Sequence, residues 1–163
     1  MKIVTVILIL LISCSRNPGI SIVSDAELQD IRDLHQNYRL FWLENDSTKV
    51  VNLFAQGGAL IPPGNSGDFV SGKVAIGNWW FSASDDGTTY PITGFEYQKD
   101  SLIVIDSRTA IWEGVSAVSW NTVRNGQIIS TAKSSSNFMT ICTKINGEWK
   151  ILRQIWNVRP EKS

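Results

Sequence analysis

Apolar residues recur at helical spacing early in the chain. They stand three and four positions apart, which predicts a helix with one buried face made of Leu28, Ile31, Leu34, Tyr38, Phe41 and Trp42. Ser24 and Glu27 fit a capping box at the start of this helix, and its end is predicted near residues 44–45. A second helix is predicted to begin after Asp46 as its cap and to stop at residues 57–58.

Strand-like spacing takes over in the second half of the chain, after a third predicted helix at residues 70–84. The dipeptides Asn125-Gly126 and Asn146-Gly147 are hairpin-turn signals. The predicted strands, the second of them bent or broken at residues 99–100, span residues 59–61, 90–105, 109–123, 127–144 and 148–158. Helices followed by an antiparallel meander predict an α+β fold, with N-terminal helices packed on a curved antiparallel sheet and a cavity between them.

The first residues of the chain have the pattern of an export signal. Lys2 precedes an apolar run at residues 3–12, whose helical length of about 15 Å is half of a bilayer core of about 30 Å. A run this short is typical of a signal peptide rather than of a membrane span. Leu11-Ile12-Ser13-Cys14 resembles a bacterial lipobox, in which a signal peptidase cuts before a lipid-modified cysteine.

These features predict the organisation and location of the chain. We expect a lipoprotein signal peptide over residues 1–13, a tether over residues 14–23 and one domain over residues 24–160. A lipid on Cys14 would anchor the domain to a bacterial membrane in the cell envelope, on a periplasmic or other extracytoplasmic side. The alternative is an ordinary secretory signal in which Cys14 is incidental.

Composition and charge remove several classes of function. Lys and Arg number 15, as do Asp and Glu, so no net positive field would attract nucleic acid. Two cysteines and one histidine exclude a disulfide scaffold, a thiolate zinc site and a His-rich metal centre, and we expect neither a metal nor a cofactor. Cys142 is expected to be a small buried residue.

Several short segments, in this order and spacing, resemble the nuclear transport factor 2-like superfamily. The segments are Tyr38-x7-Asp46-x3-Val50-x2-Leu53-Phe54-Ala55, Ile61-Pro62-Pro63-Gly64, and Ser71-Gly72-Lys73-x-Ala75-Ile76-x2-Trp79-Trp80. The superfamily includes ketosteroid isomerases and SnoaL-type polyketide cyclases, and the chain's ending from Gly147 to Ile151 is similar to a branch known only as a domain of unknown function. The resemblance implies a cone-shaped α+β fold and frequent sheet-to-sheet dimers.

The resemblance also allows the catalytic groups of ketosteroid isomerases to be compared with this chain. Those enzymes pair a tyrosine with an aspartate base and a protonated aspartic acid. Tyr38 falls where the tyrosine would lie, but Pro62 stands in the place of the base. Residues 130–146 contain no Asp or Glu to serve as the second acid, so isomerase-type proton transfer is disfavoured.

Three residues are candidate catalytic groups, each with a structural alternative. Tyr38 could donate a hydrogen bond to a ligand or be a buried tyrosine with a backbone partner. His35 is the only side chain with an ordinary pKa near neutrality, although its place at the helix margin favours a surface or interface residue. Glu113 could be desolvated inside the cone with a raised pKa, but the orientation out of the sheet is favoured.

Aromatic residues are the main candidates for ligand binding. Large flat rings line apolar pockets well, so we expect a site for a small apolar or ring-containing molecule made of Trp42, Trp79, Trp80, Trp112, Trp120, Gln154 and Trp156, although about half of the tryptophans are expected only to fill the core. Alternation puts Gln154 and Trp156 on one face of the last strand and Arg153 and Asn157 on the other. The strand at residues 109–123 is apolar on both faces, which predicts a covering second subunit and hence a homodimer.

Three functional hypotheses follow from these features. The favoured one is a membrane-anchored small-molecule-binding protein with an aromatic-lined cone pocket. The second is a SnoaL-like enzyme of isomerase, cyclase, dehydratase or hydrolase type that uses Tyr38 with His35 or Glu113. The third is a non-catalytic dimerisation module whose cone is closed by its own side chains, and the volume of the cavity separates it from the other two.

Overall fold

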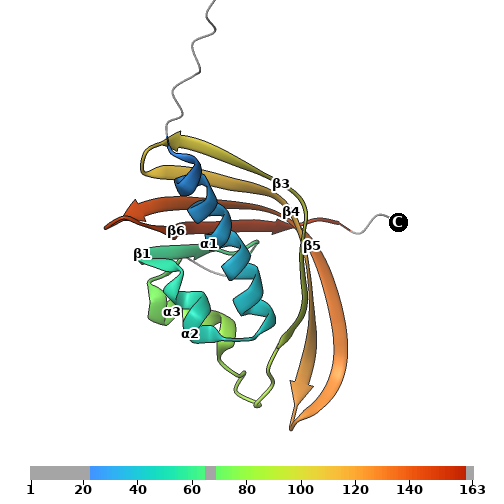
Figure 1. Ribbon diagram of the computed structural model, residues 1–163. Coiled ribbons are helices and arrows are strands. Elements are labelled where there is room, and N and C mark those ends of the chain that lie inside the picture. The colour runs from blue at the N-terminus through green and yellow to red at the C-terminus, as the bar shows by residue number, and fades with distance from the viewer. Residues whose placement is uncertain (1–22, 65–68, 161–163) are drawn as a thin grey trace, which may run out of the picture.

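The computed structural model describes residues 23–64 and 69–160, which form helices packed against one curved sheet (Figure 1). The elements are α1 (Asp25–Leu43), α2 (Ser47–Asn52), β1 (Phe54–Ile61), β2 (Val70–Ser71), α3 (Lys73–Phe81), β3 (Ile92–Asp106), β4 (Thr109–Arg124), β5 (Gln127–Ile145) and β6 (Glu148–Val158). The strand order is β2-β1-β6-β5-β4-β3. All neighbouring strands are antiparallel except β1 and β6, which are parallel.

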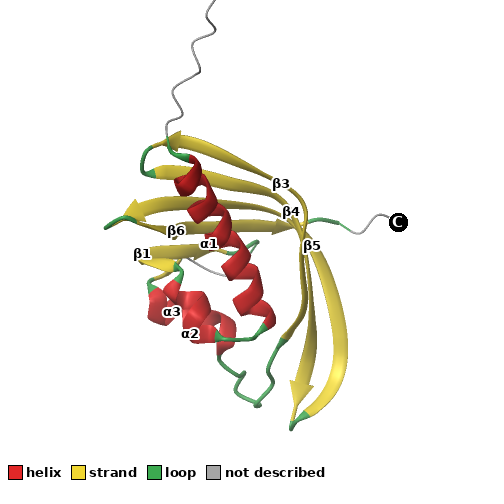
Figure 2. Cartoon of the chain, viewed as in Figure 1, coloured by secondary structure: helices red, strands yellow, loops and turns green. Residues whose placement is uncertain are grey.

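The predicted α+β architecture is confirmed. The sheet curves around α1, and α2 and α3 lie beside β1 (Figure 2). The predicted signal peptide and most of the predicted tether lie outside the described residues. Within the described part of the chain, no helix is long and apolar enough to cross a membrane.

Helix α1 begins with the predicted capping box. The Ser24 amide donates to a Glu27 carboxylate oxygen over 2.9 Å, and the Glu27 amide donates to the Ser24 hydroxyl over 3.3 Å. The Lys144 ammonium group also lies 2.6 Å from the Glu27 carboxylate, which fastens this end of the helix to β5. The buried face consists of Ile31, Leu34, His35, Tyr38 and Trp42.

Two helix boundaries in the predictions were wrong. The second helix ends at Asn52, and the glycine pair at residues 57–58 lies inside β1 rather than at a helix end. A Cβ atom on Gly58 would lie 3.0 Å from the Ile151 carbonyl oxygen, so glycine permits close approach where the pairing of β1 with β6 shifts register. The third helix is also shorter than predicted, because β2 occupies the beginning of its expected range.

The meander and its two tight turns are confirmed. Asn125 and Gly126 have φ values of 49° and 75°, and Asn146 and Gly147 have values of 51° and 89°. Positive φ at both central residues is typical of the two-residue hairpin turn whose twist matches that of the strands. The bend expected near residues 99–100 is a shift of register between Tyr97 and Lys99.

Gly114 allows the sheet to bend at this point. It pairs with Asp100, directly beside the register shift in β3. A Cβ atom at Gly114 would lie 1.9 Å from the Lys99 carbonyl oxygen, so no larger residue fits unless the two strands separate.

Replacing Gly114 should therefore destabilise the protein. We expect Gly114→Ala to lower the free energy of unfolding by about 1–3 kcal/mol, because the methyl group must displace backbone. Urea unfolding followed by circular dichroism measures the change. Gly57→Ala is the control, since a Cβ atom at Gly57 meets nothing within 4 Å. Equal stability of the two variants would contradict the close approach.

Candidate functional site

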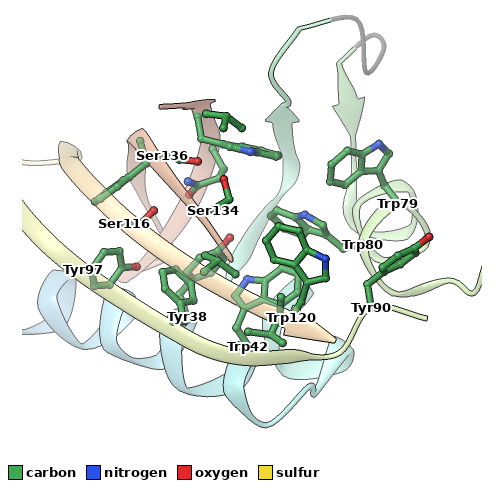
Figure 3. A pocket seen from close by; sticks show the side chains of 17 residues that line it. Tyr38, Trp42, Trp79, Trp80, Tyr90, Tyr97, Ser116, Trp120, Ser134 and Ser136 are labelled. Carbon is green, nitrogen blue, oxygen red and sulfur yellow. The ribbon is translucent and has the colours of Figure 1, made fainter. Parts of the chain in front are cut away.

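A cavity of about 420 Å³ lies between the helices and the concave face of the sheet (Figure 3). It is lined by Tyr38, Trp42, Trp79, Trp80, Tyr90, Ile92, Phe95, Tyr97, Ser116, Val118, Trp120, Ser134, Ser136, Phe138, Gln154, Trp156 and Val158. None of these residues is Asp, Glu, Lys, Arg or His. The described lining therefore combines aromatic rings with neutral hydroxyl and amide groups.

Strand alternation explains which side chains reach the cavity. Every second residue of a strand faces the same side, and the cavity side of β4 presents Ser116, Val118 and Trp120. Gln154 and Trp156 both line the cavity from β6, as their alternation predicts. Arg153, which precedes Gln154 and lies on the opposite face of the strand, instead donates a hydrogen bond of 3.0 Å to the Gly57 carbonyl oxygen.

Tryptophans from three elements form an aromatic cluster at one side of the cavity. The rings of Trp80 in α3 and Trp156 in β6 are stacked with their centroids 6.0 Å apart. Trp42 in α1 meets Trp80 edge to face at 4.8 Å. Trp79 and Tyr90 are 40% and 51% exposed, so they lie where the lining meets solvent. The cluster offers ring faces and edges to an apolar ligand.

Hydroxyl groups gather at the other side of the cavity. Figure 3 shows Tyr97, Ser116, Ser134 and Ser136 apart from Trp79 and Tyr90. Tyr38 lies next to the tryptophans, with its ring centroid 6.3 Å from that of Trp42. Gln154 also lines the cavity and accepts a buried hydrogen bond of 2.7 Å from the Thr140 hydroxyl. That bond occupies the amide oxygen of Gln154 and leaves its NH₂ group without a hydrogen-bond partner among the described residues.

Solved structures of low sequence identity share this arrangement of helices and sheet. A ketosteroid isomerase-like protein from Erwinia carotovora atroseptica SCRI1043 is 14% identical with a TM-score of 0.64, over 85% of this chain and 100% of its own. An NTF2-like protein with a cystatin-like fold from Novosphingobium aromaticivorans is 14% identical with a TM-score of 0.61, over 85% of both chains. The chain has the nuclear transport factor 2-like fold.

The hexachlorocyclohexane dehydrochlorinase LinA-type3 from Novosphingobium barchaimii LL02 is another example of this fold. It is 10% identical with a TM-score of 0.60, over 83% of this chain and 88% of its own. At such identities the likeness establishes the fold alone. No family model matches the sequence, and no curated protein matches it.

In this nuclear transport factor 2-like cone, Tyr38 reaches the cavity from α1. Its side chain is 5% exposed, and its ring packs edge to face against Phe95 at 5.9 Å. Burial raises the pKa of the Tyr38 phenol above its ordinary value, and burial also raises the pKa of Tyr97. Both phenols are therefore neutral hydrogen-bond donors at neutral pH. Pro62 is buried but does not line the cavity.

His35 does not belong to the cavity, and its expected place at the surface or an interface was wrong. It is 2% exposed, and its ring is stacked on Trp112 with the centroids 4.4 Å apart. Its Nε2 atom lies 3.4 Å from the Cys142 sulfur, and Nδ1 has no hydrogen-bond partner among the described residues. Burial lowers the pKa of His35 to about 3. The imidazole is thus a neutral core group and does not contact the cavity as a base.

Two further candidates also lie outside the cavity lining. Glu113 pairs with Ser101 in β3 and Met139 in β5, and alternation with the inward-facing Trp112 directs it to the outer face of the sheet. This is the orientation that the sequence favoured, and it separates the carboxylate from Tyr38. Trp112 faces inward but is buried against His35 in the core. Tyr38, Trp42, Trp79, Trp80, Trp120, Gln154 and Trp156 are the predicted site residues that do line the cavity.

The sequence did not identify four residues of the lining as site residues: Tyr97, Ser116, Ser134 and Ser136. A signal for the two serines of β5 was present in the sequence: residues 134, 136 and 138 alternate with outward positions, so that two hydroxyls and Phe138 share one face.

Cys142 is fully buried, which confirms the expected small buried cysteine. Burial raises the pKa of its thiol to about 12.

The buried imidazole predicts a stability that depends on pH. An unfolded histidine takes up a proton near pH 6.5, whereas folded His35 does so only near pH 3. Stability is therefore full above pH 6.5 and falls as the pH is lowered, by at most about 1.4 kcal/mol per pH unit from this group. We expect His35→Leu to flatten the dependence between pH 7 and pH 5, measured by urea unfolding at each pH.

The chosen pH range separates His35 from the carboxylates. Glu27, whose pKa is lowered to about 2 chiefly by its hydrogen bond from Lys144, loses its stabilising effect only below about pH 5. If His35→Leu and the unaltered protein show the same slope above pH 5, the buried neutral imidazole is refuted.

Proposed function

We propose that the protein binds a small, uncharged, largely apolar molecule with at least one ring in the aromatic cavity, without acid–base catalysis by the cavity lining. The absence of ionisable acids and bases other than phenols from the described lining supports this proposal most directly. A carboxylate or an ammonium group entering such a site would lose hydration without meeting an opposite charge. An apolar ring is only weakly hydrated, so it would lose little hydration free energy on entering the cavity, and it would gain contact with the indoles.

The size of the cavity argues against a cone closed by its own side chains. About 420 Å³ lies within the range of small-molecule sites, which is about 300–1,000 Å³. A binding role is therefore favoured over that of a module that only dimerises.

The geometry gives less support to the enzymatic alternative. Proton transfer requires a base within hydrogen-bond reach of the substrate, directly or through one water. His35 is enclosed in the core, and Glu113 lies on the outer face, so neither side chain joins Tyr38 at the cavity. The binding function requires no such group.

Filling the cavity should abolish binding. We expect Val118→Trp, on the cavity face of β4, to weaken binding of 1-aminoanthracene at least tenfold, because the new indole occupies the ligand's space. The probe is neutral at pH 7, and its emission rises in apolar surroundings. A fluorescence titration of each protein measures the dissociation constant.

Val115→Trp makes the same change on the outer face of the same strand and should leave the affinity unchanged. Circular dichroism melting shows whether both variants remain folded. Equal binding by two folded variants would place the probe elsewhere, and no binding by the unaltered protein would refute the proposed function.

We also propose that Cys14 is lipid-modified and anchors the domain to a bacterial membrane. The support is the lipobox-like sequence ending at Cys14 behind a short apolar run. Formation of a homodimer through the outer face of the sheet likewise stays a prediction.

Replacing Cys14 tests the anchor. In bacteria that express the full chain and are fed an alkyne fatty acid, we expect the unaltered protein to be labelled and to sediment with membranes. Cys14→Ser should lose both properties, because it lacks the thiol that accepts the lipid. Cys142→Ser is the matched control and should keep both. Unlabelled protein in the presence of a labelled control lipoprotein would contradict the proposal.

A further inference from the structure

Hydroxyl groups from three neighbouring strands lie side by side on the concave face. The sheet register pairs Tyr97 of β3 with Ser116 of β4, and Ser116 with Ser136 of β5. Ser134 lies two residues from Ser136 on the same face and pairs with Val118. Directly paired side chains have Cβ atoms about 5 Å apart, and diagonal neighbours such as Ser116 and Ser134 are about 7–8 Å apart. We call these four residues the hydroxyl row.

The hydroxyl row has unused hydrogen-bonding capacity. The Ser134 hydroxyl is buried and has no hydrogen-bond partner among the described residues. Ser116 is only 7% exposed and lines the same cavity. Buried polar groups in proteins nearly always have a partner, so an orphaned hydroxyl on a residue that lines a cavity points to a group that enters the cavity.

The surroundings of the row restrict the chemistry of that group. A hydroxyl both donates and accepts, so the row matches an alcohol, a phenol or a carbonyl oxygen. The NH₂ group of Gln154 adds a donor on the same cavity wall. No cation lines the described cavity to offset the desolvation of a carboxylate.

The positions of the hydroxyl row and of the indoles indicate where the ligand carries its ring and its polar group. Trp120 lies on the cavity face of β4 four residues beyond Ser116, and Trp42 and Trp80 line the same cavity (Figure 3). A ligand that reaches both sides needs a ring system for the indoles and a polar group at one end for the hydroxyls.

We propose that the row of Tyr97, Ser116, Ser134 and Ser136 is a subsite for a neutral hydroxyl or carbonyl group of a ring-containing ligand, and that it selects such ligands over the corresponding carboxylates. This inference rests on the proposed binding function and names the ligand class. The row supplies the specificity of the site, and the indoles supply most of the apolar contact.

A matched series of ligands tests the subsite. Naphthalene, 2-naphthol and 2-naphthoate share one ring system and differ in the polar group, which at pH 7 is absent, neutral and anionic respectively. Each compound competes with 1-aminoanthracene in a fluorescence displacement titration. We expect 2-naphthol to bind about tenfold more tightly than naphthalene, as one or two neutral hydrogen bonds allow, and 2-naphthoate to bind more weakly than 2-naphthol.

The double variant Ser134→Ala with Ser136→Ala locates the effect. It should lose most of the preference for 2-naphthol over naphthalene. Ser135→Ala is the matched control, because the Ser135 hydroxyl is also buried without a partner among the described residues but belongs to an outward position of the same strand. The control should keep the full preference.

The outcomes separate this inference from the proposed function. If naphthalene and 2-naphthol bind equally well to the unaltered protein, or if 2-naphthoate binds best, the subsite is refuted while the binding function stands. If the preference persists in a folded double variant, the row is not the subsite. If 1-aminoanthracene does not bind to the unaltered protein, the proposed function itself fails. Melting curves verify that each variant is folded.

Discussion

The close approach of Gly114 to the Lys99 carbonyl sets the geometry on which the rest of the cone depends. At this point β3 shifts register against β4, and the absence of a Cβ atom lets the two backbones meet. Bulges increase the local twist and bend of a strand pair. The bent strands can then pack against α1 near one end and stand away from it near the other. The core and the cavity are consequences of the same bend.

Two successive turns of α1 illustrate this division. Near its middle, His35 is enclosed by Trp112 and Cys142, and the space is filled so closely that the imidazole remains neutral. One turn later, Tyr38 reaches the cavity, and Trp42 also contributes to its lining. The Tyr38 side chain is surrounded by aromatic rings but still lines the cavity. One helix therefore contributes a titratable group to the solid core and a hydrogen-bond donor to the cavity.

Local signals were sufficient for much of the fold, whereas the site depended on register. The capping box at Ser24 and the turn at Asn125 were predictable because neighbouring residues alone determine them. The glycines of β1 were misread because a helix stop and a strand bulge use the same residue type. Burial of His35 depends on what β4 and β5 place over the helix. The grouping of Ser116 with Ser136 likewise appears only when the strands are paired.

The same enclosure would have a different effect if it contained an acid. A carboxyl surrounded by these rings would be desolvated, and its pKa would rise toward the range in which it can exchange protons at neutral pH. The described lining supplies serine hydroxyls, an amide and phenols instead, whose charge states do not change near neutrality. Such groups can orient a polar substituent by donating and accepting hydrogen bonds, but they cannot serve as a general base without a partner. The side chains of the described lining thus suit this cavity to orienting a neutral polar group through hydrogen bonds.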